Sequence, residues 1–182
     1  MKFNNKKSGF TLAEVLVTLM IIGVIAAMTI PSLMQSTSSQ EYKTAFKKAV
    51  SMLNQAVTLN YALDGQDGSD FTQTSFFNLM TKRLNVMSSN GSSALYTADG
   101  MWFSTTAPSA TGTSPGKLSG GACSTEDTTT MCSVVYVDVN GAKGPNAWSE
   151  STAKVKDVFA IAIYPQKALP ATEAYAEILY SK

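Results

Sequence analysis

Three residues near the N-terminus combine residue types and spacing that could do chemistry: Gly9, Phe10 and Glu14. Glu14 is the one charged residue among residues 12–33. A carboxylate in apolar surroundings is costly unless a positive group neutralises it. Gly9 has no side chain and leaves an open peptide bond directly before an aromatic residue. The pattern therefore requires a cationic partner for Glu14.

The surrounding segment, residues 10–34, is long and apolar enough to cross a bilayer. Residues 12–33 contain eleven Leu, Ile and Val residues, which contribute on the order of −5 kcal/mol to insertion. A span needs ~20 residues. Three lysines in the leader, residues 1–9, direct the N-terminus to the cytoplasm and the remainder to the outside. Pro31 removes a backbone hydrogen bond, so we expect a helix kink there.

The stretch KKSGFTLAEVLVTLMIIGVIAA closely resembles the cleavage and methylation motif of type IV prepilins and of the pseudopilins of type II secretion. The resemblance implies that a membrane aspartate peptidase cuts after Gly9 and methylates the new amine of Phe10. It also implies that Glu14 of one subunit neutralises the amine of its neighbour and sets the axial register. Pro31 falls where many family members carry a helix-melting proline.

The alternative for this segment is an ordinary secretory signal or a plain membrane anchor. A secretory signal has an apolar core of about 7–15 residues, followed by a cut site of small residues. Here the run is longer, and it continues into a second periodic segment. This continuity favours a filament subunit over a signal peptide.

The second periodic segment predicts that the helix continues to about Leu63. Apolar residues recur every three or four positions, as expected for an amphipathic helix with one core-facing stripe: Tyr42, Phe46, Ala49, Leu53, Val57 and Tyr61. Asp64-Gly65 is a turn signal that ends the helix. A long N-terminal helix results, beginning at Thr11.

The rest of the chain predicts a small antiparallel sheet, and so an α+β, pilin-like fold in which the sheet packs against the long helix. A short helix is expected at residues 71–87 and a loop at 88–93. Strands are expected at residues 94–104 (two, around Asp99-Gly100), 133–139 and 157–164, and the tail at 173–180 is either a strand or a helical turn. The expected organisation is a leader (1–9), a filament-core helix (10–34), its amphipathic continuation (35–64) and a globular head (65–182).

Cys123 and Cys132 are the two cysteines of the chain. Beyond a membrane segment, a pair at this spacing predicts a small-loop disulfide in an oxidising compartment. Two free thiols that never meet are the alternative. The spacing does not match paired zinc knuckles.

A second set of residues, Asp138, Asn140 and Asp157, could bind calcium. Together with a backbone carbonyl, they could supply the oxygen ligands that calcium needs. They belong to a pattern, D-x-N-G-x-x-G-P-N followed by D-x-F, which resembles a signature in the heads of many pilin-like proteins. The chain departs from that signature by an insert at residues 149–156. The alternative is that these side chains only cap turns. The acidic segment 64–70 lacks the spacing of a calcium loop, and we expect it to be a solvated turn.

Composition excludes several function classes. The chain has no histidine, which rules out histidine-dependent triads and histidine-based zinc sites, and no other catalytic grouping is present. A net charge of +1 does not suggest a nucleic-acid surface. No enzyme activity, resident cofactor or nucleic-acid partner is expected, apart from the calcium hypothesis.

These observations favour a structural subunit of a type IV pilus-like filament or of a type II secretion pseudopilus. The alternative is a minor or tip subunit whose head recognises a surface, a secreted substrate or DNA. The implied partners are other pilin-like subunits, the prepilin peptidase, an inner-membrane assembly platform and lipid. The implied location is the inner membrane and then a periplasmic or cell-surface filament.

Overall fold

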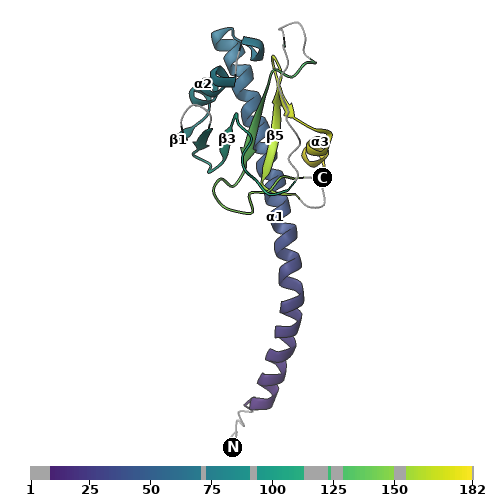
Figure 1. The fold of residues 1–182 in the computed structure, drawn as a ribbon. Coiled ribbons are helices and arrows are strands. Elements are labelled where there is room, and N and C mark those ends of the chain that lie inside the picture. The colour runs from purple at the N-terminus through teal and green to yellow at the C-terminus, as the bar shows by residue number, and fades with distance from the viewer. Residues whose placement is uncertain are drawn as a thin grey trace, which may run out of the picture. The chain divides into compact units, whose positions relative to one another are not determined.

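A computed structural model describes residues 9–70, 73–90, 94–112, 123, 129–149 and 155–181. The chain divides into two compact units, Met1–Ser38 and Ser39–Lys182. Helix α1, Leu12–Asp64, contributes residues to both units and continues past Pro31 (Figure 1). The expected long N-terminal helix is confirmed, whereas the kink at Pro31 stays a prediction.

The second unit contains a six-stranded antiparallel sheet whose strands follow one another in chain order. Its other elements are η1 (Gly68–Asp70), α2 (Gln73–Arg83), β1 (Val86–Asn90), β2 (Ala94–Thr97), β3 (Trp102–Ser104), β4 (Ser133–Asp138), β5 (Val158–Ile163), β6 (Ala168–Pro170) and α3 (Glu173–Tyr180). Strands β1 and β6 therefore form opposite edges of the sheet (Figure 1). This arrangement confirms the α+β class.

The core of the second unit lies between the sheet and the C-terminal part of α1. Phe46, on α1, stacks on Phe159 of β5 with ring centroids 4.2 Å apart. Tyr175 of α3 meets both rings edge-on. Aromatic pairs in these geometries add about 0.5–1.5 kcal/mol each beyond the area that they bury. The predicted apolar stripe is therefore buried from Phe46 to Val57, whereas the prediction is wrong at Tyr61, which is exposed.

The other face of the sheet is also covered at its centre. All residues of β4 and β5 are buried, as expected for strands packed on both faces. Trp148 packs edge-on against Tyr136 of β4, with ring centroids 5.8 Å apart. The segment that carries Trp148 is held by a hydrogen bond from its backbone N–H to Thr111 O (2.9 Å).

The strands at the centre of the sheet agree with the sequence predictions, and those at its edges do not. β2, β3, β4 and β5 are confirmed, including the turn at Asp99-Gly100. The expected helix at 71–87 is wrong at its end, because α2 stops at Arg83 and β1 occupies part of the expected loop. Strand β6 was not predicted. The tail is a helix, α3, capped by the Thr172 side chain, which accepts a hydrogen bond from Tyr175 N.

Two glycine turns touch one another at the end of the sheet. Gly141 has φ +67°, and a Cβ placed on it would lie 2.6 Å from Gly100 O. Both features exclude a side chain at this position. Gly65 also has a positive φ (+68°), but no atom lies within 4 Å of the place where its Cβ would be.

We therefore predict that Gly141→Ala destabilises the head more than Gly65→Ala does. The left-handed backbone costs either alanine about 1–2 kcal/mol, and the clash at Gly141 adds about 1–3 kcal/mol. Urea unfolding of the purified full chain in detergent, followed by near-ultraviolet circular dichroism, measures the difference. Equal losses for the two variants would show that the turns are not in contact.

Candidate assembly site at the helix N-terminus

The first turn of α1 is closed by three hydrogen bonds between Thr11 and Glu14. The Glu14 carboxylate oxygen Oε2 accepts from the Thr11 backbone N–H (2.8 Å) and from its hydroxyl (2.7 Å). The Thr11 hydroxyl oxygen accepts in turn from Glu14 N (3.3 Å). This is a capping box, which satisfies backbone N–H groups that have no partner inside the helix. Glu14 also lies where the helix dipole favours a negative charge.

The surface that follows is apolar on every side. No residue in the most apolar stretch of α1 is buried, and α1 is long and apolar enough to cross a membrane by length and composition. The exposed large side chains are Leu12, Val15, Leu16, Val17, Leu19, Met20, Ile21, Ile22, Val24, Ile25, Met28, Ile30, Leu33 and Met34. Transferring them from water is worth on the order of 20 kcal/mol. A helix with this surface requires lipid or other helices around it.

The few hydroxyl groups on this surface bond to their own helix. Thr18 donates to Val15 O (2.9 Å), and Thr29 donates to Ile25 O (3.0 Å). Each hydroxyl thus avoids being left without a partner in an apolar environment. Pro31 has no N–H to donate to the carbonyl of Ala27, so one bond of the helix is missing there.

In a comparison with known families, residues 4–30 match the model for the prokaryotic N-terminal methylation motif. The chain carries a prepilin-type methylation motif. This motif is the hallmark of type IV pilin and pseudopilin precursors. No curated protein and no solved structure matches the chain.

The prepilin motif contains Gly9, Phe10 and Glu14, the residues singled out in the sequence. In the structure Gly9 and Phe10 precede α1, and Phe10 is 90% exposed. Cleavage after Gly9, methylation of Phe10 and the assembly role of Glu14 stay predictions. Sequence analysis missed Thr11, although a threonine three residues before a glutamate is the signature of a capping box.

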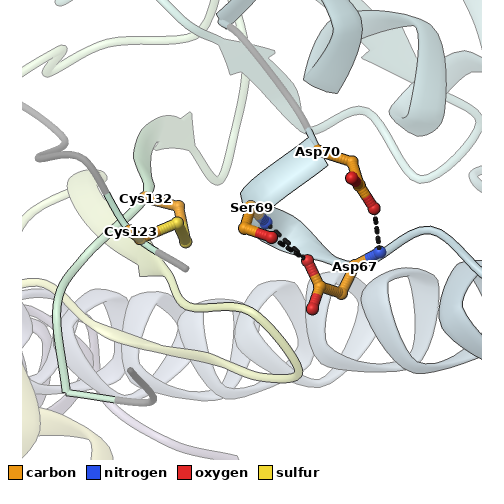
Figure 2. The surroundings of a disulfide bond; sticks show 5 residues. All are labelled: Asp67, Ser69, Asp70, Cys123 and Cys132. Carbon is orange, nitrogen blue, oxygen red and sulfur yellow. Dashed lines mark hydrogen bonds between the residues drawn. A yellow bond between two sulfur atoms is a disulfide. The ribbon is translucent and has the colours of Figure 1, made fainter. Parts of the chain in front are cut away.

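The disulfide between Cys123 and Cys132 is present. The two sulfur atoms lie 2.01 Å apart, and the Cα atoms are 5.1 Å apart. Cys132 directly precedes β4, and its backbone N–H donates to Ile163 O on β5 (2.8 Å). Figure 2 shows that its surroundings include the short helix η1. The disulfide therefore ties Cys123, in the connection between β3 and β4, to the residue that directly precedes β4.

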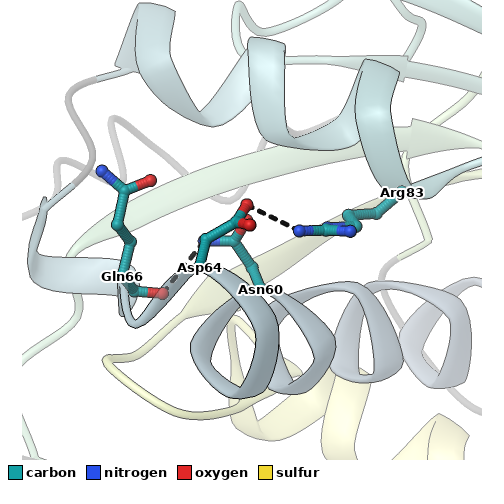
Figure 3. A network of polar contacts seen from close by, with 4 residues as sticks. All are labelled: Asn60, Asp64, Gln66 and Arg83. Atoms are coloured by element: carbon teal, nitrogen blue, oxygen red, sulfur yellow. Dashed lines mark hydrogen bonds and ion pairs between the residues drawn. The ribbon is translucent and has the colours of Figure 1, made fainter.

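The acidic turn after α1 is solvated only in part, because Asp64 and Asp70 are exposed whereas Asp67 is buried. Asp67 is only 2% exposed, and its Oδ1 accepts hydrogen bonds from the backbone N–H and the hydroxyl of Ser69 (Figure 2). Asp64 forms an ion pair with Arg83 of α2 (2.6 Å), while Asn60 donates to Gln66 O (3.0 Å; Figure 3). The polar residues of this segment hold the turn against α1 and α2.

The predicted calcium ligands meet beside the loop that joins β4 to β5. The two carboxylate oxygens of Asp157 accept from the backbone N–H groups of Asn146 and Ala147, both at 2.8 Å. Asp138 Oδ1 accepts from Asn140 N (3.2 Å). With its amide oriented to satisfy its neighbours, the Asn146 side chain donates to Asp138 Oδ2 (3.2 Å). The two aspartates therefore hold the backbone of the loop in place.

Both carboxylates are buried, and the charge of Asp157 acts on the groups beside it. Asp138 is 6% exposed and Asp157 is fully buried. Burial, followed by the charge of Asp157, raises the pKa of Asp138 from the usual 3.8 to about 7. Burial and the charge of Asp157 also raise the pKa of Tyr42, on α1, while its hydrogen bond with Asn140 opposes that shift. Sequence analysis did not place Tyr42 at this site.

Calcium binding by Asp138, Asn140 and Asp157 stays a prediction. The described part of the chain contains no group of three or more His, Cys, Asp or Glu side chains placed to hold a metal ion. The two aspartates bond backbone amides, which is the role expected if they only cap turns.

We predict that the stability of the head falls as the pH rises from about 4 to 7. Over this range the folded chain keeps a proton on Asp138 that the unfolded chain has lost, so unfolding becomes easier by about 1.4 kcal/mol per pH unit. Asp138→Asn should flatten this dependence, because the residue no longer titrates. Denaturant midpoints between pH 4 and 8, compared with those of Glu173→Gln at an exposed site, test the assignment. An unchanged slope in Asp138→Asn would contradict it.

Proposed function

We propose that this protein is a structural subunit of a type IV pilus-like filament or of a type II secretion pseudopilus. In this proposal the leader, residues 1–9, is removed, Phe10 becomes the methylated N-terminus, and residues 10–34 form the filament core. Residues 35–64 continue that helix into the head, residues 65–182. The observation that carries the proposal is the methylation motif on a helix whose apolar surface is exposed on all sides.

The exposed surface of α1 supports both stages of this life cycle. Before assembly, the bilayer covers the apolar side chains, and the basic leader keeps the N-terminus in the cytoplasm. During assembly, the helix leaves the lipid, and equivalent helices of other subunits replace it. Helices in lipid gain little from the hydrophobic effect when they associate, so close packing and polar contacts must direct them.

Glu14 is the polar contact best suited to direct this packing. The two hydrogen bonds that the Glu14 carboxylate accepts from Thr11 both use Oε2. Its other oxygen, Oε1, has no hydrogen bond within the described part of the chain. Cleavage after Gly9 creates a positive amine on Phe10. In a filament the Phe10 amine of one subunit can pair with Oε1 of the next, while the capping box keeps that carboxylate fixed. The pairing removes two uncompensated charges from the apolar core.

Processing at Gly9 is tested by Gly9→Val. The branched side chain should hinder the peptidase at that bond, and uncut precursor should accumulate in the membrane. Intact-mass measurement should find wild-type chains that begin at Phe10, carry one methyl group and lack the two hydrogens of the disulfide thiols. Normal processing of Gly9→Val would contradict the cleavage assignment.

The role of Glu14 between subunits is tested against its role within the helix. Glu14→Leu removes both roles, whereas Thr11→Val removes only the hydroxyl of the capping box. We expect both variants to be cleaved, Thr11→Val to form filaments, and Glu14→Leu to lose most of them by electron microscopy and by recovery in sheared fractions. Equal filament yields from the two variants would show that Glu14 acts only as a helix cap.

A further inference from the structure

Two aromatic residues that solvent reaches, Tyr96 and Trp102, lie side by side on the sheet. In the antiparallel register, Tyr96 of β2 is directly opposite Trp102 of β3. The side chains of directly opposite residues project from the same face of a sheet. Tyr96 is exposed and Trp102 is only half-buried. Because tryptophan is among the most buried residues on average, this pair needs an explanation.

The pair lies on the face of the sheet that points away from α1. Phe103, which follows Trp102 on β3, is fully buried and belongs to the row of paired residues that reaches Phe159 on β5. Phe159 stacks on Phe46 of α1, so that row faces α1. Successive side chains of a strand alternate between the two faces. Trp102 therefore projects from the opposite face, and Tyr96 projects with it.

Strand β1 extends this pair into a row through a β-bulge. Val86 pairs with Thr97 and Ser88 pairs with Tyr96, so Met87 is an extra residue between the two pairs. Ser88 is exposed on the same face as Tyr96, and Met87 is 76% exposed. Bulges redirect side chains and are common at sheet edges and beside functional sites. We name Ser88, Tyr96 and Trp102 the aromatic row.

The loop between β4 and β5 borders the aromatic row on its other side. Trp102 pairs with Asp138 of β4, which is buried and accepts a hydrogen bond from Asn140 N in that loop. The Tyr96 ring also reaches the loop, because its Cε1 lies 3.8 Å from the place where a Cβ on Gly141 would be. The row is thus exposed on β1 and β2 and bounded by the loop at β4.

The strands that carry the aromatic row are free of charge. Strands β1, β2 and β3 contain no charged residue. The turn between β2 and β3 carries Asp99, whose carboxylate forms an ion pair with Lys48 (3.0 Å). A surface for single-stranded nucleic acid combines aromatic rings with a positively charged groove, and a surface for anionic lipid needs a cluster of basic residues. A neutral partner therefore complements this row.

We propose that the aromatic row binds a chain of neutral sugars. The C–H face of a pyranose ring is flat and apolar, so it stacks on an aromatic ring, and its hydroxyl groups bond to polar groups beside that ring. Ser88 supplies such a group next to Tyr96. Neighbouring strands lie about 4.8 Å apart, so three strands span about 10 Å, the length of two sugar rings. This binding goes beyond the proposed filament function and does not depend on assembly.

Binding is tested with the full chain in phosphatidylcholine nanodiscs, which present no sugar, on an array of neutral and acidic oligosaccharides. Neutral chains of glucose, N-acetylglucosamine, galactose or mannose should retain the protein, and titration with the best of them should change its tryptophan fluorescence. Tyr96→Ala should weaken this binding about tenfold, because one of two stacking rings is lost, whereas Tyr96→Phe should bind like the wild type. Tyr180→Ala, at an exposed tyrosine outside the row, is the control.

Two neighbouring serines of β1 give a matched pair of variants that leave both aromatic rings in place. Ser88→Arg puts a bulky side chain beside Tyr96 and should block the row. Ser89→Arg makes the same change one residue further on, where the side chain projects from the other face because Ser89 pairs with the buried Leu95. Both serines are exposed on an edge strand, so the head should still fold. Equal sugar binding by the two variants would overturn the proposal.

The array and the filaments give separate outcomes. Failure of every neutral chain to retain the protein would overturn sugar binding, and so would equal affinities of the wild type and Tyr96→Ala. Stronger retention by acidic chains, or by single-stranded oligothymidine, would overturn it in favour of a charged partner. Ser88→Arg should still assemble into filaments, so a loss of sugar binding with normal filaments is the expected result and leaves the filament function standing.

Discussion

The constraint on which the rest of the structure depends is the apolar surface of α1 in the first unit. Within the part of the chain that the structure describes, its large side chains, from Leu12 to Met34, are exposed. A contiguous apolar surface of this size is typical of a site that contacts lipid or other protein surface. The match to the prokaryotic N-terminal methylation motif, at residues 4–30, covers most of this apolar segment.

The second unit differs, because its large apolar side chains are mostly buried in a core of its own. It uses α1 as one layer of this core, with Phe46 stacked on Phe159 and the central strands buried on both faces. A single helix therefore carries two kinds of surface along its length, apolar all round in one unit and apolar on one stripe in the other. This change of pattern is visible in the sequence.

The sequence predicted those features that depend on local pattern. Long periodicity predicted α1, β-branched runs predicted β4 and β5, and the spacing of two cysteines predicted their disulfide. The edges of the sheet could not be predicted, because β1 contains two serines and an asparagine, and β6 contains Pro170. Such strands form because they pair with a neighbouring strand, not because their residues have a high β-strand propensity. Proline is tolerated on an edge strand.

At the Asp138–Asp157 site and at Glu14, the sequence predicted the functional residue types but not their hydrogen-bond partners. Asp138 and Asp157 were identified as candidate calcium ligands. The sequence could not show that both carboxylate oxygens of Asp157 accept hydrogen bonds from backbone N–H groups of its own loop. The same distinction applies to Glu14, whose Oε2 is held by Thr11 within the helix. A carboxylate has two oxygens. When hydrogen bonds within the helix hold one of them, they also fix the direction in which the other points. In the proposed filament, Glu14 therefore closes its own helix through one carboxylate oxygen and presents the other to the amine of a second copy.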